Sequence, residues 1–273
     1  MHYGFVLPKG DARIAANFAR EAELAGWDGF FVWEPVWGVD AWISLTAAAM
    51  VTERICLGTM ISPIARMRPW KLASETATLD NLSGGRVILS VGLGALDTGW
   101  AEFGEVTDRR TRAELLDECL DIVTGLWKGQ PFNYAGKHYM VKESWFQVPP
   151  PPVQQPRIPI WVVGAWLRQK SMQRALRYDG LLPAIMNDDG KVRMGPPTPA
   201  EIQQIKAYVD GKANGAPFDI VVEGETTREN LQSAKRVQEF ADAGATWWLE
   251  AQWAASDLES VLQRIRQGPP NRW

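Results

Sequence analysis

The chain of 273 residues is poor in histidine and has no excess of either charge, and each scarcity removes classes of function. His2 and His138 are the only histidines, so a histidine zinc site, a Ser-His-Asp triad and an HExxH helix are close to excluded. With 29 Lys and Arg against 32 Asp and Glu, the chain offers no basic excess to nucleic acid or to an anionic membrane. We therefore expect neither partner, and no histidine relay in the chemistry.

Long apolar runs and targeting segments are also missing. Charged or turn-forming residues interrupt each apolar run before the roughly 18 residues that a membrane span requires. The N-terminal MHYGFVLPKGD has no basic region followed by a long apolar stretch, so we expect no secretory signal and a cytoplasmic location by default. The two cysteines, Cys56 and Cys119, fall in a strand-like and a helix-like run, where we expect them to be buried, reduced thiols.

Alternation of strand and helix patterns is the main organising feature. The length is close to the roughly 250 residues of a (β/α)8 barrel, and eight short apolar runs are each followed by a segment with apolar residues at helical spacing. The expected strands are Tyr3–Leu7, Gly29–Glu34, Ile55–Ile61, Val87–Gly92, Ile160–Gly164, Gly180–Ala184, Phe218–Glu223 and Thr246–Glu250. We predict an α/β fold, a single closed TIM barrel over 1–273. A doubly wound open sheet would need a glycine-rich turn after its first strand, and LPKGDAR has one glycine.

Helix boundaries are marked by capping residues. Asp11 is placed to cap the first helix and Gly26 to end it, and Pro69 fits the first turn of another. Two capping boxes are expected, Thr198-Pro-Ala-Glu201 and Ser256-Asp-Leu-Glu259.

Residues 132–159 interrupt the alternation between the fourth and fifth strands. NYAGKHYMV predicts a small hairpin that turns at Gly136, and VPPPPVQQPRIP predicts extended proline-rich chain. We interpret the segment as a surface excursion within one barrel, because the four units after it are needed to complete eight. A domain linker is the alternative.

Residues that follow the strands are the candidates for function, because ligands bind at the C-terminal ends of barrel strands. Glu34, Glu223 and Glu250 could serve as oxygen ligands for Mg²⁺, as an acid and base pair, or as anchors for loop N–H groups. The 14 tryptophans suit a pocket for a flat aromatic ligand, although core packing uses the same residue type.

The segment Gly164–Ser171, GAWLRQKS, is the best phosphate candidate. It combines a strand end and a helix start with Arg168, Lys170 and the Ser171 hydroxyl, and a solvated basic first turn is the alternative. Arg66 and Arg68, beyond the third strand, are a weaker candidate.

Four blocks resemble the luciferase-like flavin-dependent oxidoreductase family, the bacterial luciferase-like monooxygenases. They are GFVLP...AREAELAGWDGFFVWEP, LGTMISPIARMRPWKLASETATLDNLSGGRVILSVGLG, RAELLDECLDIVTGLWKGQPFNYAGKHY and IPIWVVGAW...RALRYDGLLP, within about the first 185 residues. The resemblance implies a (β/α)8 barrel that binds FMN or coenzyme F420, a deazaflavin, with the ring at the strand ends and the phosphate after the fifth strand.

The resemblance also assigns residues. Glu34 stands where many members have an acidic residue near the flavin, and the stretch from Thr59 through Met60 to Ile61 matches a bulged strand behind the ring, often with a cis peptide. The other implied cofactor contacts are Gly92 and Gly94 on strand 4, and Gly164, Ala165, Trp166, Arg168 and Ser171 in the phosphate loop.

Two departures bear on the chemistry. Many members follow the acidic residue with histidine, whereas this chain has Pro35, which neither donates nor accepts a proton. Trp166 replaces one of two small residues common in the phosphate loop, so the phosphate would rest on backbone N–H groups and Arg168.

The function expected from these observations is a flavin-dependent monooxygenase that uses reduced FMN and oxygen on a small organic substrate. F420-dependent hydride transfer, a non-catalytic flavin-binding barrel and a metal-dependent hydrolase built on the three glutamates are alternatives. A flavin reductase partner and a homodimer stay open. Glu34 or Glu250 is the expected proton-handling residue, and the expected substrate walls are Trp33, Trp37, Trp166 and Trp253.

Overall fold

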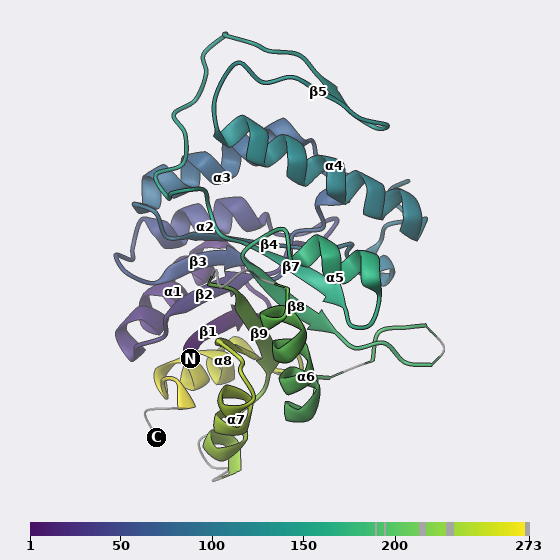
Figure 1. The fold of residues 1–273 in the computed structure, drawn as a ribbon. Coiled ribbons are helices and arrows are strands. Elements are labelled where there is room, and N and C mark those ends of the chain that lie inside the picture. Colours follow the sequence, from purple (N-terminus) through teal and green to yellow (C-terminus); the bar gives the residue numbers. More distant parts are fainter. Residues whose placement is uncertain (189, 194, 213–216, 228–231, 271–273) are drawn as a thin grey trace.

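Eight parallel strands close into a barrel in the computed structural model, which describes residues 1–188, 190–193, 195–212, 217–227 and 232–270 (Figure 1). The strands follow one another around the barrel in chain order, and the last pairs with the first. Their bounds are β1 His2–Leu7, β2 Gly29–Val32, β3 Cys56–Thr59, β4 Val87–Val91, β7 Ile160–Ala165, β8 Gly180–Ala184, β9 Asp219–Gly224 and β10 Trp247–Ala251. The predicted (β/α)8 barrel is confirmed, and the closed ring excludes the open doubly wound sheet.

Eight described helices surround this barrel (Figure 1). They are α1 Ala12–Ala25, α2 Ala41–Ala49, α3 Pro69–Ser83, α4 Arg109–Trp127, α5 Gln169–Ala175, α6 Pro199–Asp210, α7 Gln232–Asp242 and α8 Leu258–Arg266. The predicted cap at Asp11 and the capping box at Thr198 are confirmed. The prediction at Ser256 was wrong by one residue: Asp257 is the N-cap, and its carboxylate accepts the N–H of Ser260 at 2.7 Å. None of the described helices is long and apolar enough to cross a bilayer.

Glycine on three neighbouring strands makes room for one large side chain in the barrel interior. A Cβ at Gly4 or Gly29 would lie 2.7 Å from the Phe31 ring, and one at Gly58 would lie 2.8 Å from it. The Phe31 ring stacks on Trp161 with centroids 5.6 Å apart. The interior is therefore packed at this level, and any ligand must enter at one of the two ends of the barrel.

The segment between β4 and β7 passes over α3 and α4, at the top of Figure 1. It contains the predicted hairpin, with β5 Tyr134–Ala135 antiparallel to β6 Met140–Val141 and a Gly136 N–H to Tyr139 carbonyl bond of 2.9 Å. The buried Glu118 carboxylate of α4 accepts the backbone N–H groups of three successive residues, 137–139. Glu114, one helix turn earlier, contacts the side chains of Lys137 and His138, so two α4 carboxylates fasten the hairpin to the barrel.

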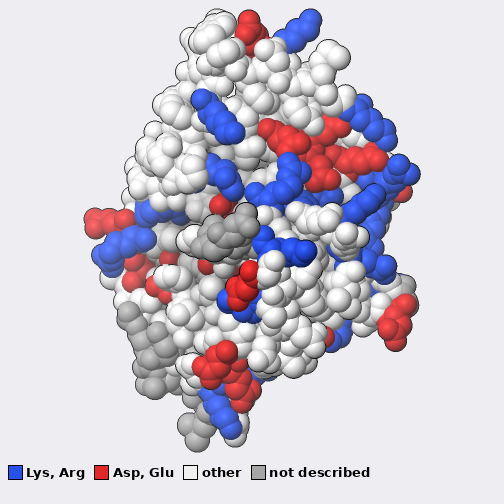
Figure 2. Space-filling view, viewed as in Figure 1, with Lys and Arg blue, Asp and Glu red and all other residues white. Residues whose placement is uncertain are grey.

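Charged side chains of both signs lie intermixed on the face drawn in Figure 2. Ion pairs between Arg174 and Asp117, and between Arg177 and Asp121, join α4 to the end of α5. These pairs neutralise part of the basic charge that follows β7.

Candidate active site

A cavity of about 460 Å³ opens at the C-terminal ends of the strands. Its volume lies within the range usual for small-molecule sites. Apolar side chains on or just after β3, β7, β8, β9 and β10 form most of its wall. The lining includes Met60, Val163, Leu182, Glu223, Glu225 and Trp253. The position is the one where barrel enzymes bind their ligands.

A smaller cavity of about 260 Å³ lies beside it, between the ends of β1 and β2 and the start of α2. Trp33 and Trp37 line this second cavity, and Trp33 meets Trp253 of the first cavity edge to face, with centroids 6.5 Å apart. The Trp33 indole N–H donates to the Pro8 carbonyl at 3.0 Å, which fixes the orientation of the ring. Trp37 is 80% exposed beside Phe103. Three of the predicted substrate-side tryptophans therefore border the two mouth cavities, and the fourth, Trp166, packs against Tyr208 of α6.

Glu34 lies directly after β2 between Trp33 and Pro35, and its carboxylate lines neither mouth cavity. Only 9% of the side chain is exposed; the Ser62 hydroxyl donates to Oε2, and a guanidinium nitrogen of Arg66 lies 3.5 Å from Oε1. Arg66 also donates to the Pro35 carbonyl at 2.8 Å. Of the two arginines beyond the third strand, Arg66 and Arg68, Arg66 is the one that pairs with Glu34.

Burial raises the pKa of the Glu34 carboxyl from 4.5 to about 7. The hydrogen bond from Ser62 and the charge of Arg66 lower it, but desolvation outweighs both. A carboxyl with this pKa can both hold and release a proton near neutral pH, which is the property required of a general acid or base.

The stretch from Thr59 to Ser62 links Glu34 to the first cavity. The Met60–Ile61 peptide bond is cis, as the resemblance implies, and Met60 lines the cavity. The Thr59 hydroxyl oxygen lies 3.1 Å from Ser62 Oγ, and the Thr59 hydroxyl donates to the Ser90 carbonyl at 3.1 Å. Ser62 was not predicted as a site residue, because only the tertiary structure brings it to Glu34.

The two glycines at the end of β4 make room for side chains of the protein itself, not for a ligand on an open surface. A Cβ at Gly92 would lie 2.7 Å from Ile61 Cδ1 and 2.9 Å from Val163 Cγ2. Gly94 has a φ of +77°, and a Cβ there would lie 2.6 Å from the Trp100 ring. Both glycines therefore allow the strand ends to pack closely behind the cavity.

The predicted phosphate loop, Gly164–Ser171, follows β7, and some of its polar groups form hydrogen bonds within the protein. The Ala165 N–H donates to Ser171 Oγ at 2.9 Å, and the Trp166 N–H donates to the Ala184 carbonyl. Gly164 faces Leu181 and Met172, so it admits the close approach of α5 to the strand. Arg168 is exposed at the N-cap of α5. The structure thus leaves Arg168 and Lys170 exposed at the start of α5, where both could meet an anion, whereas Gly164, Ala165 and Ser171 have contacts within the protein.

Glu250 does not face the mouth, in contrast to its predicted proton-handling role. Along β10 the side chains of 247, 249 and 251 pack in the barrel interior, so Glu250 points outward to the helices. It is fully buried, lies 3.3 Å from Arg264, and accepts from the Thr226 N–H at 2.8 Å and from the Trp248 indole. Burial raises its pKa, and these partners lower it. The geometry identifies a buried ion pair that fastens α8 to the barrel.

Among the three glutamates, Glu223 is the one that lines the first cavity, although the proton-handling role was predicted for Glu34 or Glu250. It lines the first cavity on β9 and accepts the Trp253 indole N–H. Burial raises its pKa, and the hydrogen bond from Trp253 lowers it. Because Glu34, Glu223 and Glu250 each contact different partners, they do not converge as the hydrolase alternative requires, and the described part of the chain holds no cluster of three potential metal ligands.

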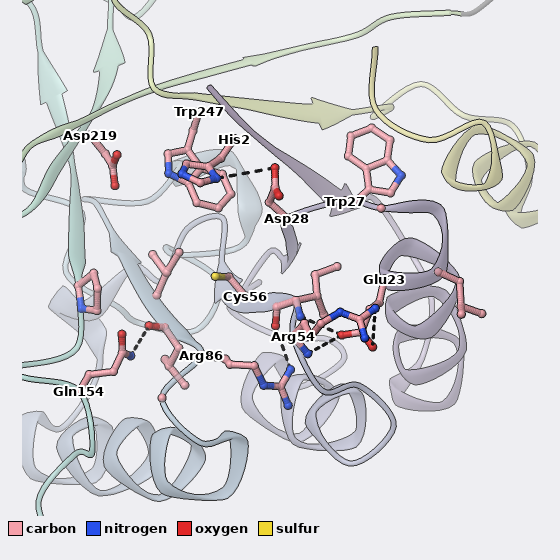
Figure 3. Close-up of a pocket in the computed structure, with 17 residues that line it drawn as sticks. His2, Glu23, Trp27, Asp28, Arg54, Cys56, Arg86, Gln154, Asp219 and Trp247 are labelled. Carbon is pink, nitrogen blue, oxygen red and sulfur yellow. Dashed lines mark hydrogen bonds and ion pairs between the residues drawn. The ribbon is translucent and has the colours of Figure 1, made fainter. Parts of the chain in front are cut away.

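A larger cavity of about 730 Å³ lies at the opposite, N-terminal end of the barrel (Figure 3). Its polar groups are largely engaged: Asp219 accepts from Trp161 and Thr246, and Arg86 donates to four carbonyls around α2 and α3. Figure 3 shows Trp247 and His2 next to each other over this end. Since barrel enzymes place their chemistry at the C-terminal end, the mouth cavities are the candidate active site.

Comparison with known proteins was made on sequence and on structure. The model of a protein family described as luciferase-like monooxygenase matches residues 4–210. The uncharacterized protein Rv0953c of Mycobacterium tuberculosis is 35% identical over 205 residues, covering 66% of this chain and 71% of that protein. Rv3520c of the same organism, named as a coenzyme F420-dependent oxidoreductase, is 35% identical over 144 residues, covering 50% of this chain and 38% of that protein.

Solved structures share the fold at low identity. Monooxygenase RslO1 from Streptomyces bottropensis matches with a TM-score of 0.77 at 18% identity, over 98% of this chain and 97% of that one. The oxygenating constituent of 3,6-diketocamphane monooxygenase from Pseudomonas putida, in complex with FMN, matches with a TM-score of 0.64 at 18% identity, over 97% and 83%.

Proposed function

The chain belongs to the luciferase-like monooxygenase family, and from this premise we propose that it is a flavin-dependent oxidoreductase acting on a small organic substrate at the barrel mouth. The observation that carries the proposal is the apolar cavity of about 460 Å³ bounded by Met60, whose neighbour Thr59 is linked through Ser62 to the buried Glu34 carboxyl. The activity we favour is that of a monooxygenase with reduced FMN and oxygen.

The residues at the mouth fit a flavin-type cofactor. Met60 and Val163 offer an apolar wall for a flat ring, and the exposed Arg168 offers a cation to a phosphate. When bound, the cofactor would supply the redox chemistry, and the protein would supply binding, orientation and exclusion of water.

Glu34 is the proton-handling residue in this proposal. Its pKa of about 7 allows it to be protonated or ionised at physiological pH, and the Ser62 hydroxyl is hydrogen bonded to it. Ser62 is in turn bonded to Thr59, next to Met60 in the cavity wall. Pro35 occupies the place of the histidine found in many members, so Glu34 and Ser62 take over that part of the site.

F420-dependent hydride transfer is the second candidate. The relative Rv3520c favours this candidate, because that protein is named as a coenzyme F420-dependent oxidoreductase and is 35% identical over half of this chain. Oxygen is not a reactant in that chemistry, so the two candidates differ in a quantity that can be measured.

The test is a parallel titration of the purified chain with FMN and with F420, followed by tryptophan fluorescence. We expect quenching by one of them, because Trp33 and Trp253 border the cavities. The bound cofactor is then reduced, and its reoxidation is followed with candidate substrates in air and under anaerobic conditions. Turnover that requires oxygen identifies a monooxygenase, and turnover without oxygen identifies hydride transfer. No quenching by either cofactor would contradict the proposal, and binding without turnover would favour a non-catalytic flavin-binding barrel.

A further inference from the structure

The first mouth cavity is apolar except at one side of its wall. Met60, Val163 and Leu182 face a carboxylate, Glu223, whose lumen-facing position follows from the alternation along β9, where Val221 also points inward. The exposed Glu225 lies at the edge of the same cavity. Among the described residues that line it there is no lysine, arginine or histidine.

Among the residues that the structure describes, Glu223 has one hydrogen-bond donor and no counter-ion. The Trp253 indole N–H donates to Oε1, and none of the described groups donates to Oε2. No charged side chain is among the causes that shift the pKa of Glu223, which burial raises. An ionised carboxylate taken out of water is costly unless a cation or several donors compensate it, so this site lacks a partner that a ligand could supply.

We propose that this cavity accepts an apolar molecule that carries an ammonium group, with Glu223 as its counter-ion. The ammonium would occupy the side of the cavity bounded by Glu223 and Trp253, and the apolar part would lie against Leu182, which leaves Met60 and Val163 as the wall proposed for the cofactor ring. This inference rests on the proposed function only in treating the cavity as the substrate site; binding itself requires no cofactor.

The experiment compares three probes of nearly equal size: benzylamine, benzyl alcohol and phenylacetate. Binding to the full chain at pH 7.5 is followed by tryptophan fluorescence and by the indole N–H resonance of Trp253. We expect benzylammonium to bind about tenfold more tightly than benzyl alcohol, and phenylacetate to bind more weakly than both, because the carboxylate attracts one charge and repels the other.

Glu223→Gln keeps the shape and removes the charge, so the preference for benzylammonium should fall to about parity with benzyl alcohol. Glu225→Gln is the matched control, because it removes an exposed carboxylate from the same edge, and it should keep most of the preference. Thermal melts of both variants establish that they are folded.

Equal binding of benzylammonium and benzyl alcohol to the unmodified chain would overturn the proposal. So would an unchanged preference in a folded Glu223→Gln variant. The binding is repeated with saturating FMN and with F420: if either displaces benzylammonium completely, the cavity belongs to the cofactor and the substrate class is wrong. Failure of both cofactors to bind would overturn the proposed function while leaving the ammonium preference as an independent result.

Discussion

Three glutamates near the strand ends have three different environments, although they look alike in the sequence. Glu34 is buried against Ser62 and Arg66, Glu223 is bonded to one indole, and Glu250 is held by an arginine with several further donors. Desolvation raises the pKa of each, and it raises that of Glu34 to about 7. The partners, rather than the residue type, decide which one can handle a proton.

We expect Glu34→Gln to lower the turnover of the cofactor-loaded enzyme by about 10²-fold, the range for loss of a general acid or base. Gln keeps the hydrogen bond from Ser62 but cannot exchange a proton. The rate per bound cofactor is the measurement, with Glu53→Gln, at an exposed site far from the mouth, as the control. An unchanged rate together with a lower melting temperature would establish Glu34 as an anchor for Arg66 and withdraw the proton-handling assignment.

The phosphate prediction can be tested at Arg168, the exposed cation at the N-cap of α5. We expect Arg168→Glu to weaken cofactor binding by about 1.5–3 kcal/mol, the range for a hydrogen bond to a charged group. The dissociation constant of FMN or F420 is compared with that of Arg13→Glu, which reverses an exposed charge on α1. Equal constants in the two variants would remove Arg168 from the site.

The two thiols should be unreactive in the native chain. Burial raises the pKa of Cys56 to about 11 and that of Cys119 to about 12, so little thiolate exists at neutral pH. Cys119 is buried, and Cys56 is half-buried at the cavity in Figure 3. A disulfide reagent should therefore modify both slowly until denaturant is added. Rapid modification that abolishes cofactor binding would contradict this expectation.

At the scale of elements, the N-terminus of α8 allows a direct test of a helix cap. Asp257→Ala should lower the free energy of unfolding by about 1 kcal/mol, because it removes the acceptor for the Ser260 N–H. Ser256→Ala should change it by less, since the Ser256 hydroxyl bonds only to the Asp257 side chain in the structure. Urea unfolding of both variants gives the comparison, and a larger loss for Ser256→Ala would restore the capping box first expected at that residue.

Local signals in the sequence located the elements well but not the direction of their side chains. Asp11, Gly26 and Thr198 act within one helix turn, so the sequence alone could predict their roles. The strands of a parallel barrel are buried on both faces, and β10 is buried throughout, so no polar alternation marks the inward side. For this reason the sequence places Glu223 and Glu250 alike at the mouth and predicts the proton-handling role for Glu250, which points outward, rather than for Glu223, which lines the cavity. The Ser62–Glu34 contact joins residues 28 apart and required the closed sheet.

At the scale of the whole molecule, Glu34 makes stability depend on pH in the direction opposite to that of a salt-bridged carboxylate. Its pKa is about 7 in the folded chain and near 4.5 when unfolded, so the folded state binds the extra proton between these values. The contribution to stability is complete below pH 4.5 and is lost as the pH rises to about 7. We expect the unfolding free energy to fall by about 2–3 kcal/mol between pH 5 and pH 8 on account of this group.

The measurement is urea unfolding at both pH values for the unmodified chain and for Glu34→Gln. The variant should lack this part of the pH dependence, while the contributions of Glu223 and Glu250 remain in both proteins and cancel in the difference. Parallel pH profiles would mean that Glu34 ionises normally and that the proton-handling proposal lacks its basis.

The Phe31 ring in the barrel interior couples the substitutions that neighbouring positions can accept. A Cβ on Gly4 or Gly29 would collide with this ring, so neither glycine can acquire a side chain while Phe31 stays. A Cβ on Gly58 would also lie 2.5 Å from the Ile88 carbonyl oxygen, so Gly58 is closed to a side chain whatever residue stands at 31. A smaller residue at 31 would leave a void that additions at positions 4 and 29 could fill. Substitutions at these three positions are therefore expected to be epistatic, and in a set of related barrels positions 4, 29 and 31 should covary.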